Sequence, residues 1–223
     1  MLKIVVFDCG YGGEFFADRL ATEFPLVEII RVIDWRHAQE IQTNSRLARE
    51  YAKQALRPYL GKVDLIILAN HFLSITSLRH FKRKYKTQKF LGFNLTPSDI
   101  MRDTLLLTTK PVTKTVNYYN FLRHLKCKHK TLSLDSWPAK IDDGELTEQE
   151  ISTTLKLFLA KTAFRPKVLI LACTNFSDIK PNLTDFFGRS IKIYDGYDEV
   201  INKTYKLLNI RGGSGKKSKK MLK

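Results

Sequence analysis

Three short segments place polar or ionisable side chains where buried strands are expected to end. They are 7–13 (FDCGYGG), 69–71 (ANH) and 172–175 (ACTN). In the third, Cys173 stands between an apolar run and a predicted helix, a position that stabilises the thiolate form of a cysteine. The hydroxyl of Thr174 and the amide of Asn175 could hold the ends of a small polar molecule. This pattern favours a nucleophile or proton-transferring thiol over an inert core cysteine.

The first segment is a glycine-rich turn. Gly10, Gly12 and Gly13 let the backbone turn tightly and approach a ligand closely, and a helix is predicted to follow. Free N–H groups at that helix start could hold a carboxylate or a phosphate. The spacing matches neither a Walker loop nor the GxGxxG pattern, so it does not support nucleotide binding.

The cysteines indicate neither a disulfide framework nor a zinc site. There are three of them, far apart in the sequence, and no Cys/His cluster has metal-ligand spacing. We therefore expect no metal. Cys127 is interpreted as a small buried hydrophobic residue.

Short apolar runs alternate with longer amphipathic stretches along the chain, which is typical of parallel sheets covered on both faces by helices. The expected strands are 2–7, 27–33, 63–69, 89–93, 104–108, 130–134, 167–172 and 190–194. The expected helices are 14–24, 44–58, 76–86, 113–125, 147–162, 178–187 and 197–208. The fold class is therefore α/β.

One strand–turn–helix segment occurs twice. LIILANHFLSI at 65–75 aligns without gaps on LILACTNFSDI at 169–179. Chance similarity between buried strands is one explanation. The other is a pair of similar α/β domains, each contributing one strand end to a shared cleft, because ligands bind beyond the carboxyl ends of strands in open α/β sheets.

Composition places the chain among globular proteins that carry an excess of positive charge. Hydrophobic residues make up 43%, no apolar run reaches the length of a membrane span, and the formal net charge is +16. We expect a cytoplasmic protein without a membrane segment. The end of the chain, RGGSGKKSKKMLK from Arg211, is predicted to be a disordered basic tail that could contact polyanions weakly. HFKRKYK at 80–86 is interpreted as a solvated helix face.

Longer stretches resemble the glutamate racemase family of the aspartate/glutamate racemase superfamily. VFDCGYGG (6–13) resembles the family's Asp-Ser-Gly-x-Gly-Gly turn, and LIILANHFLS (65–74) stands where a strand leads into Cys-Asn-Thr. LILACTNFSDIKPNLTDFFGRSIKIYDG (169–196) resembles the segment that carries Cys-Thr-His-Tyr-Pro. LGFNLTPSD (91–99) and WPAKIDDGELTEQEI (137–151) also fit, so the resemblance extends to about residue 208.

The resemblance implies two Rossmann- or flavodoxin-like domains related by a pseudo-twofold axis, with the site in the cleft between them. Their expected extents are 1–94 with 196–211, and 95–195, followed by a tail at 212–223. It implies a small acidic amino acid as substrate, proton transfer between two opposed thiols without pyridoxal phosphate or another cofactor, and a homodimer. Asp8, Asn70 and Thr174 match polar residues that support this chemistry.

The catalytic pair departs from the family pattern. Cys173 matches the second catalytic cysteine, but Ala69 stands in the place of the first and cannot transfer a proton. His71 replaces a threonine, Asn175 replaces a histidine and Cys9 replaces a serine.

Three interpretations remain open. Cys9 or His71 takes over the lost role, although each could instead be a packing or turn residue. Alternatively, Cys173 works alone, as the single cysteine does in arylmalonate decarboxylase of the same superfamily. In the third interpretation the fold is a non-catalytic ligand-binding or regulatory module. The working hypothesis is a racemase-like enzyme with Cys173, Cys9 and His71 as acid/base candidates, and with Asp8, Asn70, Thr174 and Asn175 binding substrate.

Overall fold

The computed structural model describes residues 1–94 and 102–210, which form two parallel four-stranded sheets. The first sheet has the order β2-β1-β3-β4, and the second has the order β6-β5-β7-β8. The strands are β1 Lys3–Asp8, β2 Glu28–Ile33, β3 Leu65–Leu68, β4 Phe90–Gly92, β5 Thr104–Thr108, β6 His129–Ser133, β7 Val168–Leu171 and β8 Lys192–Tyr194. Each sheet therefore repeats the same strand order, and β3 and β7 hold equivalent places.

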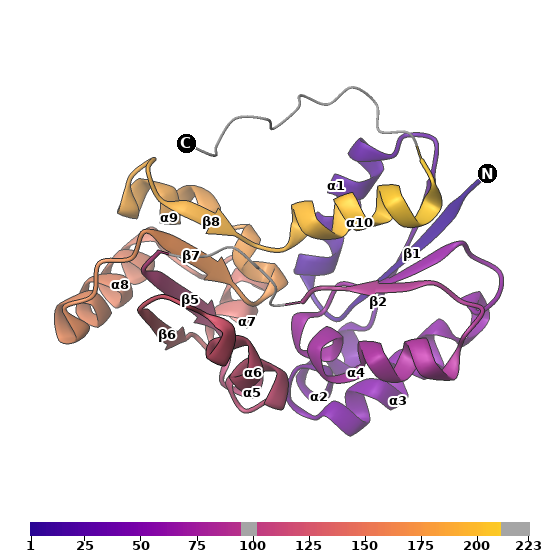
Figure 1. The fold of residues 1–223 in the computed structure, drawn as a ribbon, viewed down its shortest axis with the longest axis horizontal. Coiled ribbons are helices and arrows are strands. Elements are labelled where there is room, and N and C mark those ends of the chain that lie inside the picture. Colours follow the sequence, from indigo (N-terminus) through magenta and orange to yellow (C-terminus); the bar gives the residue numbers. More distant parts are fainter. Residues whose placement is uncertain (95–101, 211–223) are drawn as a thin grey trace.

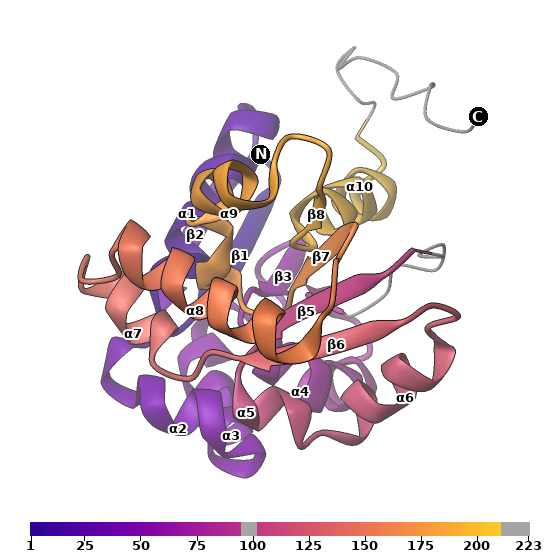
Figure 2. The same ribbon diagram turned by 90° about the vertical axis from the view of Figure 1, so that its left-hand side faces the viewer.

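Helices cover both faces of each sheet (Figures 1 and 2). The α-helices are α1 Tyr11–Glu23, α2 Ala38–Thr43, α3 Ser45–Leu56, α4 His71–Lys84, α5 Lys110–Thr113, α6 Val116–His124, α7 Trp137–Asp142, α8 Glu148–Thr162, α9 Lys180–Phe187 and α10 Tyr197–Leu208. Short 3₁₀ helices are η1 Trp35–His37, η2 Arg57–Tyr59 and η3 Thr174–Ser177. In Figure 1, α1 and α10 lie above the first sheet and α3 and α4 lie below it.

Alternation along the central strands creates a separate core on each face of a sheet. In the first sheet, one set of buried side chains packs against α1 and α10, and the other packs against α3 and α4. The two sets are Ile4, Val6, Leu65 and Ile67, and Val5, Phe7, Ile66 and Leu68. The second sheet repeats this arrangement, with α8 and α9 on one face and α5 and α6 on the other.

The two halves are joined by packing as well as by the chain. Phe72 and Ile75 of α4 belong to a core cluster of the second sheet, together with Leu106 and Ile170. The chain also returns to the first half after β8, because Tyr197 and Val200 of α10 complete a core of the first sheet. Helix α4 thus holds the two halves together next to the ends of β3 and β7.

The predicted α/β fold with two similar parallel sheets is confirmed. The exact domain boundaries, 1–94 with 196–211 and 95–195, stay a prediction. Residues 95–101 and the predicted tail lie outside the described residues. Among the helices that the structure describes, none combines the length and apolar character needed to cross a membrane.

Candidate active site

The carboxylate of Asp8, at the end of β1, is the meeting point of three strand ends. The backbone N–H of Cys9 donates to its Oδ1 at 2.7 Å, and Asn70 Nδ2, following β3, donates to the same oxygen at 3.1 Å. Thr174 Oγ1, following β7, donates to Oδ2 at 3.1 Å. Asp8 is 1% exposed, and this burial raises its pKa to about 6 against the opposing effect of these hydrogen bonds. Residues of both halves thus donate hydrogen bonds to one buried carboxyl group.

The glycine turn permits this contact because it brings α1 directly against η3. A Cβ on Gly12 would lie 2.5 Å from Thr174 Oγ1, and a Cβ on Gly13 would lie 2.3 Å from the Cβ of Asp8. The hydroxyl of Tyr197 donates to the carbonyl oxygen of Gly12 at 3.1 Å and lies 3.4 Å from that of Thr174. Glycine is required at these positions by close approach rather than by an unusual φ angle.

Cys173 lies at the end of β7, one residue before η3, and is half-buried. Burial raises the pKa of its thiol to about 12, although the N–H groups of Asn175 and Phe176 act in the opposite direction. The negative charges of Asp8 and Asp142 raise it further. The free protein therefore holds Cys173 as a protonated thiol at neutral pH, and not as the preformed thiolate that its position before a helix suggested.

Cys9 follows Asp8 directly, and its thiol packs in the core between the first sheet and α3 and α4. It is 1% exposed, and its Sγ lies 3.4 Å from Asn70 Nδ2 and 3.6 Å from Gln42 Nε2. Burial, and then the charge of Asp8, raise the pKa of this thiol well above its ordinary value. Ionisation of Cys173 would raise it further.

His71 begins α4 and is buried, with 4% of its surface exposed. Neither ring nitrogen has a hydrogen-bond partner among the described residues, and burial lowers its pKa to about 4. The imidazole is therefore neutral at physiological pH. Its helix is capped by Asn70, whose Oδ1 accepts from the N–H of Leu73 at 2.8 Å.

Asn175 holds a second carboxyl group at the site, which the sequence analysis did not single out. Its Nδ2 donates to Asp142 Oδ1 at 2.6 Å, and the N–H of Tyr11 donates to the same oxygen at 3.2 Å. Burial is the main cause that raises the pKa of half-buried Asp142 to about 6, and the charge of Asp8 adds to it. In the sequence, the only indication of a role for Asp142 is that it lies in WPAKIDDGELTEQEI (137–151), which resembles the racemase family.

Ala69 directly follows β3 and is fully buried. Its N–H donates to the carbonyl oxygen of Phe7 at 2.7 Å, as the N–H of Ala172, directly after β7, donates to that of Leu107 at 2.8 Å. Its side chain offers no acid/base group at the end of β3. Within residues 1–94 and 102–210, His, Cys, Asp and Glu form no group of three or more that could hold a metal ion.

A cavity of about 700 Å³ opens between the two halves, next to the first turns of α4. Phe72, Ile75 and Thr76 of α4 line one side, and Lys110, Lys114 and Thr115 around α5 line the other. This volume is within the range of small-molecule sites. The two lysines form no ion pair with another described residue, and with the single carboxylate of Asp135 in the lining they leave the cavity a net positive charge.

Fold and site together define an α/β protein with two similar parallel sheets, whose strand ends converge on buried carboxyl and thiol groups between its halves. No protein-family model matches the chain. Glutamate racemase from Helicobacter acinonychis (strain Sheeba) is 25% identical over 199 residues, which cover 83% of this chain and 76% of that protein.

Solved structures share the fold over almost the whole chain. Escherichia coli glutamate racemase, in complex with L-glutamate and the activator UDP-MurNAc-Ala, matches with a TM-score of 0.79 at 16% identity, over 97% of this chain and 86% of that one. Aspartate racemase from Picrophilus torridus matches with a TM-score of 0.63 at 16% identity, over 96% of both chains. The chain is thus similar in sequence to glutamate racemases and shares its fold with solved glutamate and aspartate racemases.

Proposed function

We propose that this chain is a cofactor-independent, racemase-like enzyme that moves the α-proton of a small acidic amino acid. The observation that carries the proposal is the position of the half-buried Cys173 thiol, beside a buried carboxyl group held by side chains from both halves. An acid/base group next to a fixed polar cluster is what proton transfer at carbon requires. The racemase names of its relatives agree with this chemistry.

The charges around the site favour an amino acid as substrate. Asp8 and Asp142 form no ion pair with a described Lys, Arg or His, so a substrate ammonium group would find two carboxyl partners. Lys110 and Lys114 line the neighbouring cavity and would attract substrate carboxylates. An acidic amino acid satisfies both requirements, whereas a dicarboxylic acid without an amino group satisfies only the second.

Cys173 is proposed as the acid/base on one face of the substrate. With a pKa of about 12 it begins as a proton donor, and a bound ammonium group near it would favour its thiolate. For the opposite face we propose Cys9, because it is a thiol that directly follows Asp8, with its Sγ 3.4 Å from Nδ2 of Asn70. His71 is the second candidate for that role, since its ring nitrogens are free to contact a ligand.

One observation supports a second candidate, an enzyme with a single working thiol. Cys9 is 1% exposed and packs in the core of the first sheet, and Ala69 supplies no acid/base group. If the Cys9 thiol does not reach the substrate, Cys173 transfers protons on one face only. Such an enzyme would exchange the α-proton without inversion, or would protonate an enediolate as a decarboxylase does.

The deciding experiment is α-proton exchange in D₂O, followed by NMR with each enantiomer of glutamate and of aspartate. Exchange with inversion supports the racemase, and exchange with retention supports the single-thiol enzyme. Absence of exchange despite ligand binding would leave a non-catalytic module and overturn the proposal.

Cys173→Ala should lower exchange at least about 10²-fold, because general acid/base groups typically contribute that much. The matched control is Cys127→Ala, which changes a half-buried cysteine whose Sγ contacts Thr104 Oγ1 and none of the site residues. Full exchange in Cys173→Ala would show that the site is assigned wrongly. If Cys9→Ala removes inversion and His71→Asn does not, Cys9 is the opposing group.

A further inference from the structure

The positive charge of the folded body is concentrated in one stretch of the chain. Residues 46–89 contain eleven Lys and Arg but only two Asp and Glu. The rest of the chain up to residue 210 is nearly balanced, with twenty-one basic and twenty acidic side chains. The excess is therefore a local property of the segment that forms α3 and α4.

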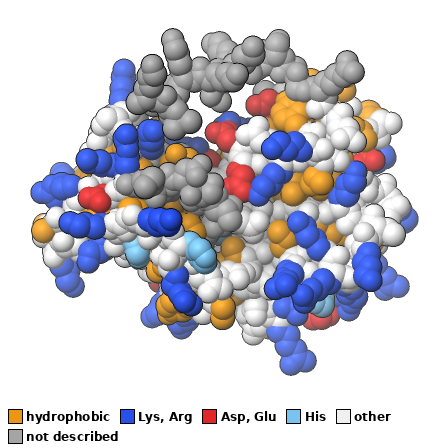
Figure 3. Space-filling model, viewed as in Figure 1, with side chains coloured by type: hydrophobic (Ala, Val, Ile, Leu, Met, Phe, Trp, Pro, Cys, Tyr) orange, Lys and Arg blue, Asp and Glu red, His pale blue; other side chains and the backbone are white. Residues whose placement is uncertain are grey.

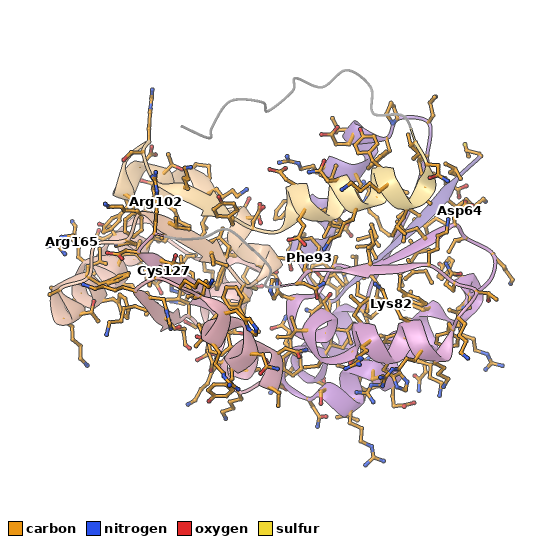
Figure 4. All side chains as sticks on the ribbon, viewed as in Figure 1. Asp64, Lys82, Phe93, Arg102, Cys127 and Arg165 are labelled. Carbon is orange, nitrogen blue, oxygen red and sulfur yellow. The ribbon has the colours of Figure 1, made fainter. Side chains whose placement is uncertain are left out.

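The fold brings these charges together on one surface. Helices α3 and α4 pack side by side against the first sheet. Lys and Arg gather over them in the lower right of Figure 3, and Lys82 is labelled on this half of the molecule in Figure 4. We call this surface the α3–α4 face; its exposed basic residues are Arg46, Arg57, Arg79, Lys82, Arg83, Lys84 and Lys86.

Little within the described structure neutralises the α3–α4 face. None of its seven basic residues forms an ion pair with a described residue; beside them on α3, Lys53 and Glu50 pair with each other at 3.5 Å. The pKa of Lys82 is lowered by burial and then by the charge of Lys203 on α10. Burial lowers the pKa of His80 too, and Arg49 and Lys84 lower it further. The face therefore carries unpaired, mutually repelling charge, which does not stabilise the fold.

We propose that the α3–α4 face binds the phosphate backbone of a nucleic acid. Arg79, Lys82 and Arg83 recur at helical spacing, which sets basic groups about 5–6 Å apart along one stripe of α4. Such a row suits a linear polyphosphate, and backbone contacts of this kind supply sequence-independent binding. The proposal does not depend on catalysis at the cleft.

Two features favour nucleic acid over other anionic partners. A membrane-binding face inserts apolar side chains, but the only large hydrophobic residue exposed on this segment is Leu47, at 37%. The face is also remote from the site: α4 begins at His71, and Lys82 lies about 16 Å further along the helix axis. A long ligand could therefore lie on this face without closing the cleft.

The test is binding of fluorescein-labelled single-stranded RNA and duplex DNA to the full chain, measured by fluorescence anisotropy at several salt concentrations. Affinity should fall steeply with salt. R79E/K82E/R83E should weaken binding at least about tenfold and reduce the log–log salt slope by about three, roughly one for each lost phosphate contact. R79Q/K82Q/R83Q should give the same slope change, which keeps the test valid if charge reversal impairs folding.

The matched control is K156E/K161E/R165E, which makes the same charge change on exposed residues of the other half; Arg165 lies at the far end of the molecule in Figure 4. It should lose much less affinity. Equal losses in the two variants would overturn the proposal, because they would reflect net charge alone. So would binding that disappears only in K216Q/K217Q/K219Q/K220Q, or tighter binding to phosphatidylserine vesicles than to either nucleic acid.

Discussion

The carboxyl group of Asp8 is the centre of the site's hydrogen-bond network, and its burial disfavours its ionised form. Three hydrogen bonds from two halves of the molecule end on its carboxyl group, yet burial still raises its pKa from 3.8 to about 6. Between pH 4 and 6 the native state therefore binds more protons than the unfolded state. Since stability falls with pH where the native state binds more protons, ionisation of Asp8 destabilises the fold above about pH 6.

Asp8→Asn should raise the free energy of unfolding at pH 7 by about 2–3 kcal/mol and change it much less at pH 4. Asparagine preserves the pattern of contacts, because its oxygen can accept from Cys9 N–H and its amide can donate to Thr174 Oγ1. Urea unfolding at both pH values measures the difference. Asp185→Asn, at an exposed carboxyl group, is the control. An equal effect at both pH values would contradict the assignment.

The polar residues at the strand ends could be predicted because parallel strands deliver their carboxyl ends to one edge. Asp8, Asn70 and Thr174 were predicted as a group and lie within one hydrogen-bond network. The burial of Cys9 and the unpartnered ring of His71 could not be predicted, because they depend on how α2 and α4 pack over the turn. Whether either thiol or imidazole transfers a proton stays a prediction.

At the scale of elements, the long periodic stretches were predictable and the short ones were not. All the expected strands occur within two residues of their predicted ends. Helix α4, however, begins at His71 rather than near residue 76, because Asn70 caps it and residues 71–75 are all buried, so they show no amphipathic period. Helices α2 and α7 have six residues each, too few to show a helical period, and were missed.

The contact between α1 and η3 has no room for a methyl group at Gly12. Gly12→Ala would place its Cβ 2.5 Å from Thr174 Oγ1 and 2.7 Å from Asn175 Oδ1. Overpacking of this kind costs about 1–3 kcal/mol, more than alanine gains in helix propensity. We expect lower stability in urea and a loss of any α-proton exchange.

The control for Gly12→Ala is Glu14→Ala, in the same turn of α1. It adds no atom to the contact and removes a half-buried ion pair with Arg31. A Gly12→Ala protein as stable and as active as Glu14→Ala would show that the two halves do not close as described.

At the scale of the whole molecule, charge is the property that sets this chain apart. With a net charge of +16, and an unpaired basic face over α3 and α4, the folded state repels itself. Raising NaCl from 0.1 to 1 M shortens the Debye length from about 10 Å to about 3 Å and should relieve this repulsion. We expect the apparent Tm to rise by about 2–4 °C, equivalent to about 1 kcal/mol.

The same measurement on a variant with fewer basic residues tests whether the repulsion comes from the α3–α4 face. R79Q/K82Q/R83Q, which removes part of the repulsion on the α3–α4 face, should have a higher Tm at 0.1 M NaCl and a smaller rise with salt. Differential scanning fluorimetry of the two proteins in parallel measures both quantities. An unchanged or falling Tm in salt would show that the basic residues are compensated in the folded state.

Because α10 packs on the first half, the two halves can complete their folding only in a fixed order during synthesis. Tyr197, Val200 and Ile201 fill a core whose other walls are β1, β3 and α1, so the first half stays incomplete while the second is being made. All the residues of the second sheet leave the ribosome before α10 does. The second half can therefore fold during translation, whereas the first half must wait, with one face of its sheet covered by α1 but not by α10, until α10 has been made.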